Sequence, residues 1–486
     1  MRTPSTRNNS AARLTILPAI AATLFAVLLP ATAPAATKGS GTASTLPSGS
    51  LIQLPGRKGC LVDQSSRPRS CGTARALKGP GPFMGSRAVV LSPDGRFVYV
   101  ASSKSDAIAI FTRNRKTGTL TQAKGKAGCI STKASSGCAS AAGLDGPNSL
   151  AMSPDGRNVY ATARDSSSVT SFRRSSSTGA LVQLSPKKGC ISDAPLPRCT
   201  TGRALGGADV ITVSPDGRNA YVGSFFGNAV AIFNRNRSSG ALTQPADATG
   251  CFTEIATTNC TTGIALASPE GMAISHDGRN VYVATAVSNA VLSFKRNRST
   301  GALAQPANGP GCISNAALTG CVTGSELGGA NAVAVSPDDD NVYVTSLTSD
   351  SVTAFSRTSS SGRLTQLFGA TSCIVWLGAT GCAPGRATRA PEGVAVAPDG
   401  TSIYIAGYSS GAISMLNRDR SIGTMMQASG DPGCVSTRAI DKCSRGRALK
   451  GTSSIALSPD GRYVYSTASK SNAIDIFRRV PLRASK

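Results

Sequence analysis

Histidine is almost absent from this chain of 486 residues, in which His276 is the only one. Catalysis by Ser-His-Asp or Cys-His groups needs an imidazole, so the sequence argues against both mechanisms. Aromatic residues make up only 5%, Trp376 is the single tryptophan, and no long segment has a helical apolar period. Glycine is abundant, with 52 residues. This composition is typical of a protein built from many short strands and turns.

Acidic residues are also scarce, with 25 Asp and Glu against 51 Lys and Arg and a formal charge of +26. Such an excess favours anionic partners, such as wall polymers, acidic polysaccharides or nucleic acids. The alternative is that the charge only keeps a soluble protein dispersed.

Only one apolar run is long enough to matter for targeting. Three arginines precede residues 14–31, and the small residues Ala33, Pro34 and Ala35 follow this run. This pattern predicts a secretory signal peptide over residues 1–35, and the alternative is a membrane anchor. A linker rich in Ser, Thr and Gly is expected over residues 36–48. We therefore expect a secreted or extracellular protein with no membrane span after signal removal.

A turn of the type Ser-Pro-Asp-Gly recurs at a fixed period. The turns begin every 61 residues, at Ser92, Ser153, Ser214, Ser275, Ser336, Ala397 and Ser458. A tyrosine follows seven residues after each start, at Tyr99, Tyr160, Tyr221, Tyr282, Tyr343, Tyr404 and Tyr465. A fixed internal period of this length indicates a repeat architecture.

Each repeat contains four short segments of strand character. In the second unit they are residues 149–153, 158–162, 168–172 and 179–184, which we call strands A to D. Seven such units predict an all-β fold, a seven-bladed β-propeller of four-stranded antiparallel blades over residues 49–486. The last unit lacks a strand D, and SGSLIQL at residues 48–54 matches TGALVQL at residues 178–184. We therefore expect residues 49–54 to pair with residues 471–477 and to close the ring.

The cysteines form seven sequence pairs, one in each unit. They are Cys60 and Cys71, Cys129 and Cys138, Cys190 and Cys199, Cys251 and Cys260, Cys312 and Cys321, Cys373 and Cys382, and Cys434 and Cys443. In a secreted chain this predicts one local disulfide in each D–A connection. Metal binding is the competing interpretation, but no histidine lies near and the spacing is unlike that of zinc sites. We expect the seven bridges to form a rigid crown on one face of the ring, each stabilising its loop by roughly 2.5–3 kcal/mol.

Seven polar residues occupy the position five before each turn, where strand A begins near the mouth of the central channel. They are Arg87, Asn148, Asp209, Glu270, Asn331, Glu392 and Ser453. We call them the mouth residues, and predict that they bind a ligand. Carboxylate and amide oxygens suit Ca²⁺, so Asn148, Asp209, Glu270, Asn331 and Glu392 form a possible metal site. Any acid–base catalysis would fall to Asp209, Glu270 and Glu392. The alternative is a wet channel that polar groups merely line.

Aromatic residues mark a second candidate surface. Trp376 lies within a cysteine loop, and Phe225, Phe226 and Tyr408 lie in B–C connections that we expect on the same face. Exposed aromatic rings there could bind a small molecule, a saccharide or a protein, whereas burial is the competing interpretation.

The opposite face is predicted to be basic. Strand C runs into basic turns at Arg113, Arg115, Arg173, Arg174, Arg235, Arg237, residues 295–298, Arg418, Arg420, Arg478 and Arg479. The A–B turns add Arg96, Arg157, Arg218, Arg279 and Arg462. Such a face could attach to an anionic wall polymer, or it could simply be solvated.

The repeat units SPDGRFVYVAS, SPDGRNVYATA and SPDDDNVYVTS, with AIAIFTRNRKTGTLTQ, resemble the YVTN-type repeats of the lactonase family of seven-bladed propellers. That family includes 6-phosphogluconolactonase-like proteins and carboxymuconate cyclases. The resemblance implies a lactonase-type propeller over roughly residues 49–479. It departs from the family where the cyclases use a histidine, since none reaches the same face here. The mouth residues are similar only in ligand type to the calcium shell of six-bladed gluconolactonases.

Three functions therefore remain open. The first is a monomeric, secreted protein that binds a ligand or partner at the channel mouth and disulfide crown. The second is a lactone hydrolase centred on Asp209, Glu270 and Glu392, either with or without a metal such as Ca²⁺. The third is a wall-associated structural protein held by its basic face.

Overall fold

The computed structural model describes residues 46–66, 70–81, 87–132, 137–306, 311–438 and 442–481. The predicted signal peptide and most of the predicted linker therefore lie outside the described residues. No helix among the described residues is long and apolar enough to cross a membrane. The unit that begins at Leu46 folds into seven six-stranded sheets, which confirms the predicted seven-bladed propeller.

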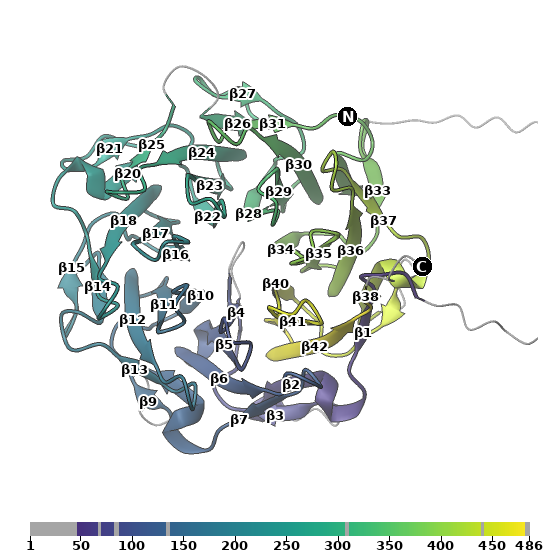
Figure 1. The fold of residues 1–486 in the computed structure, drawn as a ribbon, viewed down its shortest axis with the longest axis horizontal. Helices are drawn as coiled ribbons and strands as arrows, with labels where there is room; N and C mark the ends of the chain where they lie inside the picture. Colours follow the sequence, from purple (N-terminus) through teal and green to yellow (C-terminus); the bar gives the residue numbers. More distant parts are fainter. Residues whose placement is uncertain are drawn as a thin grey trace, which may run out of the picture. The chain divides into compact units, whose positions relative to one another are not determined.

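The blades are arranged in a ring (Figure 1), and residues from all seven blades line a central channel. Each presents its strand A to the channel: β4 (Val89–Leu91), β10 (Pro147–Met152), β16 (Ala208–Val213), β22 (Pro269–Ile274), β28 (Ala330–Val335), β34 (Pro391–Val396) and β40 (Thr452–Leu457). Every strand A contacts the next one along the chain, and β40 contacts β4. The seven blades, numbered 1 to 7 in this order, therefore form a closed ring.

Strands B and C follow outward. Strand B is β5 (Phe97–Ser102), β11 (Asn158–Ala163), β17 (Asn219–Ser224), β23 (Asn280–Thr285), β29 (Asn341–Ser346), β35 (Ser402–Gly407) and β41 (Tyr463–Ala468). Strand C is β6 (Ala107–Arg113), β12 (Ser168–Arg174), β18 (Ala229–Arg235), β24 (Ala290–Arg296), β30 (Ser351–Arg357), β36 (Ala412–Arg418) and β42 (Ala473–Arg479). The apolar faces of these strands pack against the neighbouring blade, so the core lies between blades.

The outer edge of each blade differs from the predicted single strand D, because two short strands share strand C as partner. The first is β7 (Leu120–Gln122), β13 (Leu181–Gln183), β19 (Leu242–Thr243), β25 (Leu303–Ala304), β31 (Leu364–Gln366), β37 (Met425–Gln427) and β1 (Leu51–Gln53). The second starts at the first cysteine: β8 (Cys129–Ser131), β14 (Cys190–Ser192), β20 (Cys251–Thr253), β26 (Cys312–Ser314), β32 (Cys373–Trp376), β38 (Cys434–Ser436) and β2 (Cys60–Asp63).

A sixth strand follows each second cysteine and pairs in parallel with the strand that starts at the first. These are β9 (Ala139–Ser140), β15 (Thr200–Thr201), β21 (Thr261–Thr262), β27 (Val322–Thr323), β33 (Ala383–Gly385), β39 (Ser444–Arg445) and β3 (Gly72–Ala74). All seven predicted disulfides form in the D–A connections. The strands that carry the cysteines pair outside strand C, so the bridges lie at the outer edge of the blades. The rigid crown on one face stays a prediction.

Short 3-10 turns are the only helical segments that the described residues contain. They span Gly56–Gly59, Gln64–Ser66, Ser103–Ser105, Gly125–Gly128, Ala248–Gly250 and Asp431–Gly433.

The N-terminal strand closes the ring, as predicted, although its register partners are residues 477–479 rather than the predicted 471–477. Strand β1 pairs with the end of β42, with Leu51 opposite Arg479 and Gln53 opposite Phe477. The first half of β42 pairs with β2 instead, and Leu61 lies opposite Ile474. In Figure 1 the first strands lie beside the last ones, and blade 7 therefore joins both ends of the propeller.

The recurrent tyrosine joins each blade to the next. Its hydroxyl donates to a glycine carbonyl in the following blade at 2.7–3.0 Å, as in Tyr221 to Gly301. In six blades it also accepts from the arginine that ends the following strand C, at 2.7–2.9 Å.

In all seven blades, the arginine that ends strand C pairs with a turn aspartate of the preceding blade at 2.6–3.5 Å. We call each Tyr-Arg-Asp group an inter-blade clasp. The arginines that take part are Arg113, Arg174, Arg235, Arg296, Arg357, Arg418 and Arg479. The predicted basic face is therefore smaller than the sequence indicates, because these guanidinium groups are engaged between blades.

Candidate functional site

A β-bulge at the start of strand A places six of the seven mouth residues. In blade 2, Pro147 lies opposite Ala163 and Ser149 opposite Thr162, so Asn148 between them has no partner. The same irregularity leaves out Asp209, Glu270, Asn331, Glu392 and Ser453. Bulges redirect a side chain and often occur next to active sites. Here they turn the side chains away from the normal alternation of the strand.

The six bulged residues are buried, with between 0% and 3% of their surface exposed. They are not among the residues that line the channel. The expectation that a ring of polar groups faces the channel is therefore wrong for these six, because the bulge turns them into the protein. Their roles in ligand binding and catalysis remain predictions.

Asp209 lies at the centre of the best-connected group. Its Oδ1 accepts from Asn148 Nδ2 at 2.8 Å and from Arg164 Nη1 at 3.3 Å. Its Oδ2 is buried with no hydrogen-bond partner among the described residues, as is Asn148 Oδ1. Burial raises the pKa of Asp209 to about 7, although Arg164 and Asn148 oppose this shift. Asp209 is therefore a carboxyl group that exchanges a proton near neutral pH.

Glu270 and Glu392 have less support. Neither carboxylate oxygen of Glu270 has a partner among the described residues, and nor does Glu392 Oε2. Burial, and then the nearby Asp209 carboxylate, raise the pKa of Glu270 to about 9. Burial, and then Glu270, raise the pKa of Glu392 well above its ordinary value, with Lys470 opposing. Glu270 is therefore a neutral acid at pH 7 unless a cation lies beside it, and the pKa of Glu392 is shifted in the same direction.

Asn331 and Ser453 have ordinary structural partners. Asn331 Nδ2 donates to the Pro391 carbonyl at 2.8 Å, and Thr345 donates to Asn331 Oδ1 at 2.8 Å. Ser453 lies 3.1 Å from the Thr467 hydroxyl. These hydrogen bonds satisfy the polar side-chain atoms of both residues.

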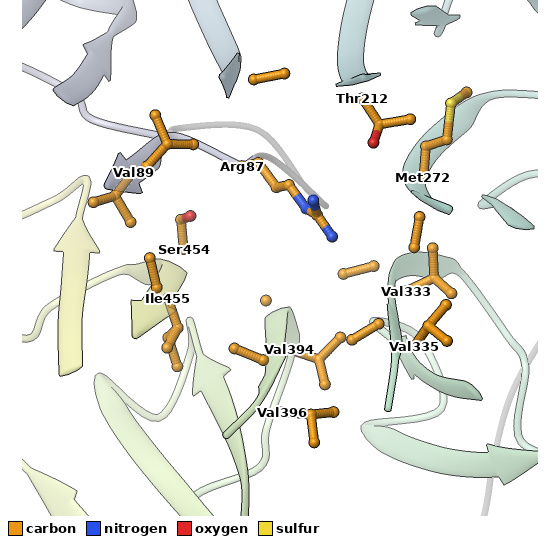
Figure 2. A pocket seen from close by; sticks show the side chains of 18 of the residues that line it. Arg87, Val89, Thr212, Met272, Val333, Val335, Val394, Val396, Ser454 and Ile455 are labelled. Carbon is orange, nitrogen blue, oxygen red and sulfur yellow. The ribbon is translucent and has the colours of Figure 1, made fainter. Parts of the chain in front are cut away.

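Arg87 differs from the other mouth residues because it lies ahead of β4 and is exposed to the channel. Figure 2 shows its guanidinium extending into a cavity of 470 Å³. The wall consists mostly of aliphatic side chains of strand A, including Val333, Val335, Val394 and Ile455. Arg87 is therefore the mouth residue that lines this cavity, and the alternative of a wet channel stays open. This aliphatic wall was not predicted from the sequence, although pairs of valines two residues apart in the same strand indicated it.

The predicted aromatic residues each lie against a cation. The Arg164 guanidinium lies 4.0 Å from the ring centre of Phe225 and 4.9 Å from that of Phe226. Arg389 lies 4.8 Å from Trp376, and Lys470 Nζ lies 4.4 Å from Tyr408. Phe226 remains 70% exposed, whereas the other three are partly buried.

The structure does not bring these aromatic residues to one point. Arg164, which contacts Phe225 and Phe226, also forms an ion pair with Asp209. Lys470, which contacts Tyr408, carries a charge that opposes the rise in the pKa of Glu392. Sequence analysis missed both cations, which lie in or beside the B–C connections. The feature that could have indicated them is a basic residue one or two positions after the end of strand B.

The carboxyl groups do not form a compact metal centre. Within the described part of the chain, no three His, Cys, Asp or Glu side chains are grouped so that they could hold a metal ion. The buried oxygens without partners are nevertheless of the hard type that Ca²⁺ prefers. Ca²⁺ binding therefore remains a prediction that rests on donor chemistry alone.

Comparisons with known proteins agree with this fold. The family described as Lactonase, 7-bladed beta-propeller matches residues 77–133 and 192–314. No curated protein matches the chain. A candidate 6-phosphogluconolactonase from Bacteroides uniformis is 19% identical, with a TM-score of 0.50 over 77% of this chain and 89% of its own.

Two other solved structures are similar. Hydrazine synthase from Kuenenia stuttgartiensis is 17% identical, with a TM-score of 0.51 over 81% of this chain and 96% of its own. The periplasmic gluconolactonase of Pseudomonas aeruginosa is 16% identical, with a TM-score of 0.49 over 79% and 94%. At such identities the likeness concerns the fold and leaves the chemistry open. The repeat and the closed ring of seven blades identify the chain as a seven-bladed β-propeller, and the family match over these two segments makes it similar to the lactonase type.

Proposed function

We propose that this protein binds a small ligand with an apolar body and one anionic group in its central channel. The observation that carries the proposal is the Arg87 guanidinium in a cavity with mainly aliphatic walls (Figure 2). A volume of 470 Å³ lies in the range of small-molecule sites. A wall of this kind removes apolar surface from water, and a single cation fixes the orientation of the ligand.

The charge of Arg87 supports an anionic group in the ligand. No carboxylate among the described residues forms an ion pair with Arg87. Desolvation by the surrounding wall lowers the pKa of its guanidinium from the ordinary value. Guanidinium groups bind carboxylates through two parallel hydrogen bonds, so a carboxylate fits best.

Replacing Arg87 with alanine is expected to weaken the binding of decanoate about tenfold or more, because a charge-assisted hydrogen bond is lost. Decanol, which has the same chain and no charge, should bind the two proteins equally. Isothermal titration with both ligands measures this difference. Arg96→Ala, which removes an exposed arginine from an A–B turn, is the control and should bind decanoate like the parent. Equal decanoate binding by the parent and Arg87→Ala would contradict the proposal.

A second candidate function is lactone hydrolysis, which the family match supports. Asp209 has a pKa of about 7 and could accept a proton from water as the water oxygen attacks a lactone carbonyl. The ring C–O bond then breaks and leaves a hydroxy acid. Because Asp209 is fully buried, this reaction requires the seam beside it to open to water.

A screen of sugar lactones and their phosphates, with and without Ca²⁺, tests this second function. If Asp209 is the base, Asp209→Asn should lower the rate at least ~100-fold, and Asp340→Asn, in an exposed turn, should not. Ca²⁺ should also raise the melting temperature of the parent and not that of Asp209→Ala/Glu270→Ala. Equal shifts would end the Ca²⁺ prediction, and an inactive parent under all conditions would end the hydrolase.

A further inference from the structure

The face formed by the A–B and C–D turns carries an uneven distribution of free arginines. The fourth residue after each turn start is arginine in five consecutive blades, at Arg462, Arg96, Arg157, Arg218 and Arg279 in blades 7 and 1 to 4. All five are exposed. Blade 5 has Asp340 at this position and blade 6 has Thr401. The charge therefore forms an arc that spans five blades and ends at an acidic turn.

The acidic residues on this face do not neutralise the arc. The turn aspartates are held by the buried arginines of the inter-blade clasps, as Asp155 is by Arg235 at 3.1 Å. Among the described residues, no carboxylate forms an ion pair with any of the five arc arginines. The sequence contains seven arginines that end strand C and five that follow the A–B turn starts. Only the structure separates those engaged between blades from those that remain available.

The C–D turns extend the arc outward in the same blades. Arg237 and Arg298 are exposed, and with Arg218 they line a surface cavity of 580 Å³. The walls of this cavity come from the A–B turns of blades 2 and 3 and from the C–D turns of blades 3 and 4. Neighbouring blades therefore contribute to one basic groove.

We propose that this arc binds a linear anionic polysaccharide that bears carboxylate groups. Arginine rather than lysine dominates the arc, and the planar guanidinium matches a carboxylate with two hydrogen bonds. Charges repeated from blade to blade suit a partner whose own charges repeat.

The chemistry of the face argues against nucleic acid. Proteins that bind single strands stack bases on exposed aromatic rings. The aromatic residues of these turns that the structure describes, Phe97 and Tyr463, are at most 5% exposed. Seven disulfides also indicate an oxidising, extracellular environment, outside the compartments where nucleic acids are stored.

The test compares two triple variants that lose the same charge. Arg157→Gln/Arg218→Gln/Arg279→Gln removes three members of the arc. Lys78→Gln/Lys104→Gln/Lys450→Gln removes three exposed lysines from the B–C connections and the loops beside them. Binding of polygalacturonate at low salt should fall about tenfold or more in the arginine variant and little in the lysine variant. Both variants are first checked for an unchanged melting temperature.

A gain-of-function variant provides a second test of the proposal. Asp340→Arg/Thr401→Arg continues the arc through blades 5 and 6 with the residue that the other five blades use, and should bind polygalacturonate several-fold more tightly. Binding by all proteins should weaken steeply as salt rises. Equal losses in the two triple variants would overturn the proposal, since net charge alone would then act. Tighter binding of single-stranded DNA than of polygalacturonate by the parent would overturn the choice of partner.

Discussion

Arg296→Met is expected to lower the free energy of unfolding by about 3 kcal/mol, the lower end of the cost of breaking a buried ion pair. Arg298→Met, two residues further along, should change it by no more than about 0.5 kcal/mol. Both substitutions remove one positive charge from the same turn. The difference between them therefore isolates the inter-blade clasp.

The expected loss follows from what Arg296 contacts. Its Nε donates to the Tyr221 hydroxyl at 2.8 Å, and its Nη2 lies 2.9 Å from Asp216 Oδ2 in blade 3. Nη1 donates to the Gly278 carbonyl at 2.9 Å. The Arg296 side chain is fully buried, whereas Asp216 is 24% exposed and water can partly replace its partner. For this reason we expect the lower end of the range.

The inter-blade clasps also determine how the free energy of unfolding changes at low pH. Burial alone would raise the pKa of Asp216, but hydrogen bonds from Ser214, Arg218 and Arg296 outweigh it and hold the pKa below its ordinary value. A carboxylate with a depressed pKa stabilises the fold at neutral pH, and this contribution is lost as pH falls through the folded-state pKa. The parent should therefore lose stability below about pH 4, and Arg296→Met should lose less.

Urea unfolding at pH 7 and pH 3.5 with the disulfides intact measures both effects. Equal unfolding midpoints for Arg296→Met and Arg298→Met at pH 7 would show that the clasp contributes nothing to the ring.

Glu270→Gln is expected to make the protein more stable at pH 8, by about 3 kcal/mol, and to change it little at pH 5. In the parent, burial and the neighbouring Asp209 raise the pKa of Glu270 to about 9. The folded state then holds a proton that the unfolded state releases near pH 4.5. Stability therefore falls as pH rises from about 4.5 to 9, and glutamine, which does not titrate, removes this loss.

The groups that act on Glu270 are Asp209, whose charge raises its pKa, and Arg164, which lowers it. A hydrogen bond with Asp339 raises the pKa of His276, but this residue lies in an A–B turn and is present in both proteins, so the comparison cancels its contribution. Urea unfolding at both pH values, in EDTA, gives the difference. If Glu270→Gln were instead less stable at pH 8, Glu270 would be a charged group with a compensating partner.

The fold could be predicted from the sequence because a turn is a local property. Pro presets the backbone and Gly supplies a positive φ, as at Gly95, Gly156 and Gly217, so the hairpins can be counted directly. The missing strand D of the last unit likewise predicts closure by the N-terminus. The split outer edge could not be predicted, since it depends on how β13 and β14 share one partner strand.

The site could be predicted only in part, because burial depends on the bulge. Alternation along strand A does not show that Asn148 or Glu270 leaves the regular pairing. The recurrent Tyr221 and Asp216 are visible as a repeat, but their shared partner Arg296 lies in the next blade. Arg87 could be identified as a mouth residue, whereas the aliphatic wall around it follows only from the way seven strands converge.

The central claim is that the channel holds an anionic, apolar ligand at Arg87. A crystal structure of the protein grown with decanoate tests it most directly. The account predicts that the alkyl chain lies along the valine-lined wall with the carboxylate beside the Arg87 guanidinium. A channel that contains only water while decanoate binds elsewhere on the protein would contradict it.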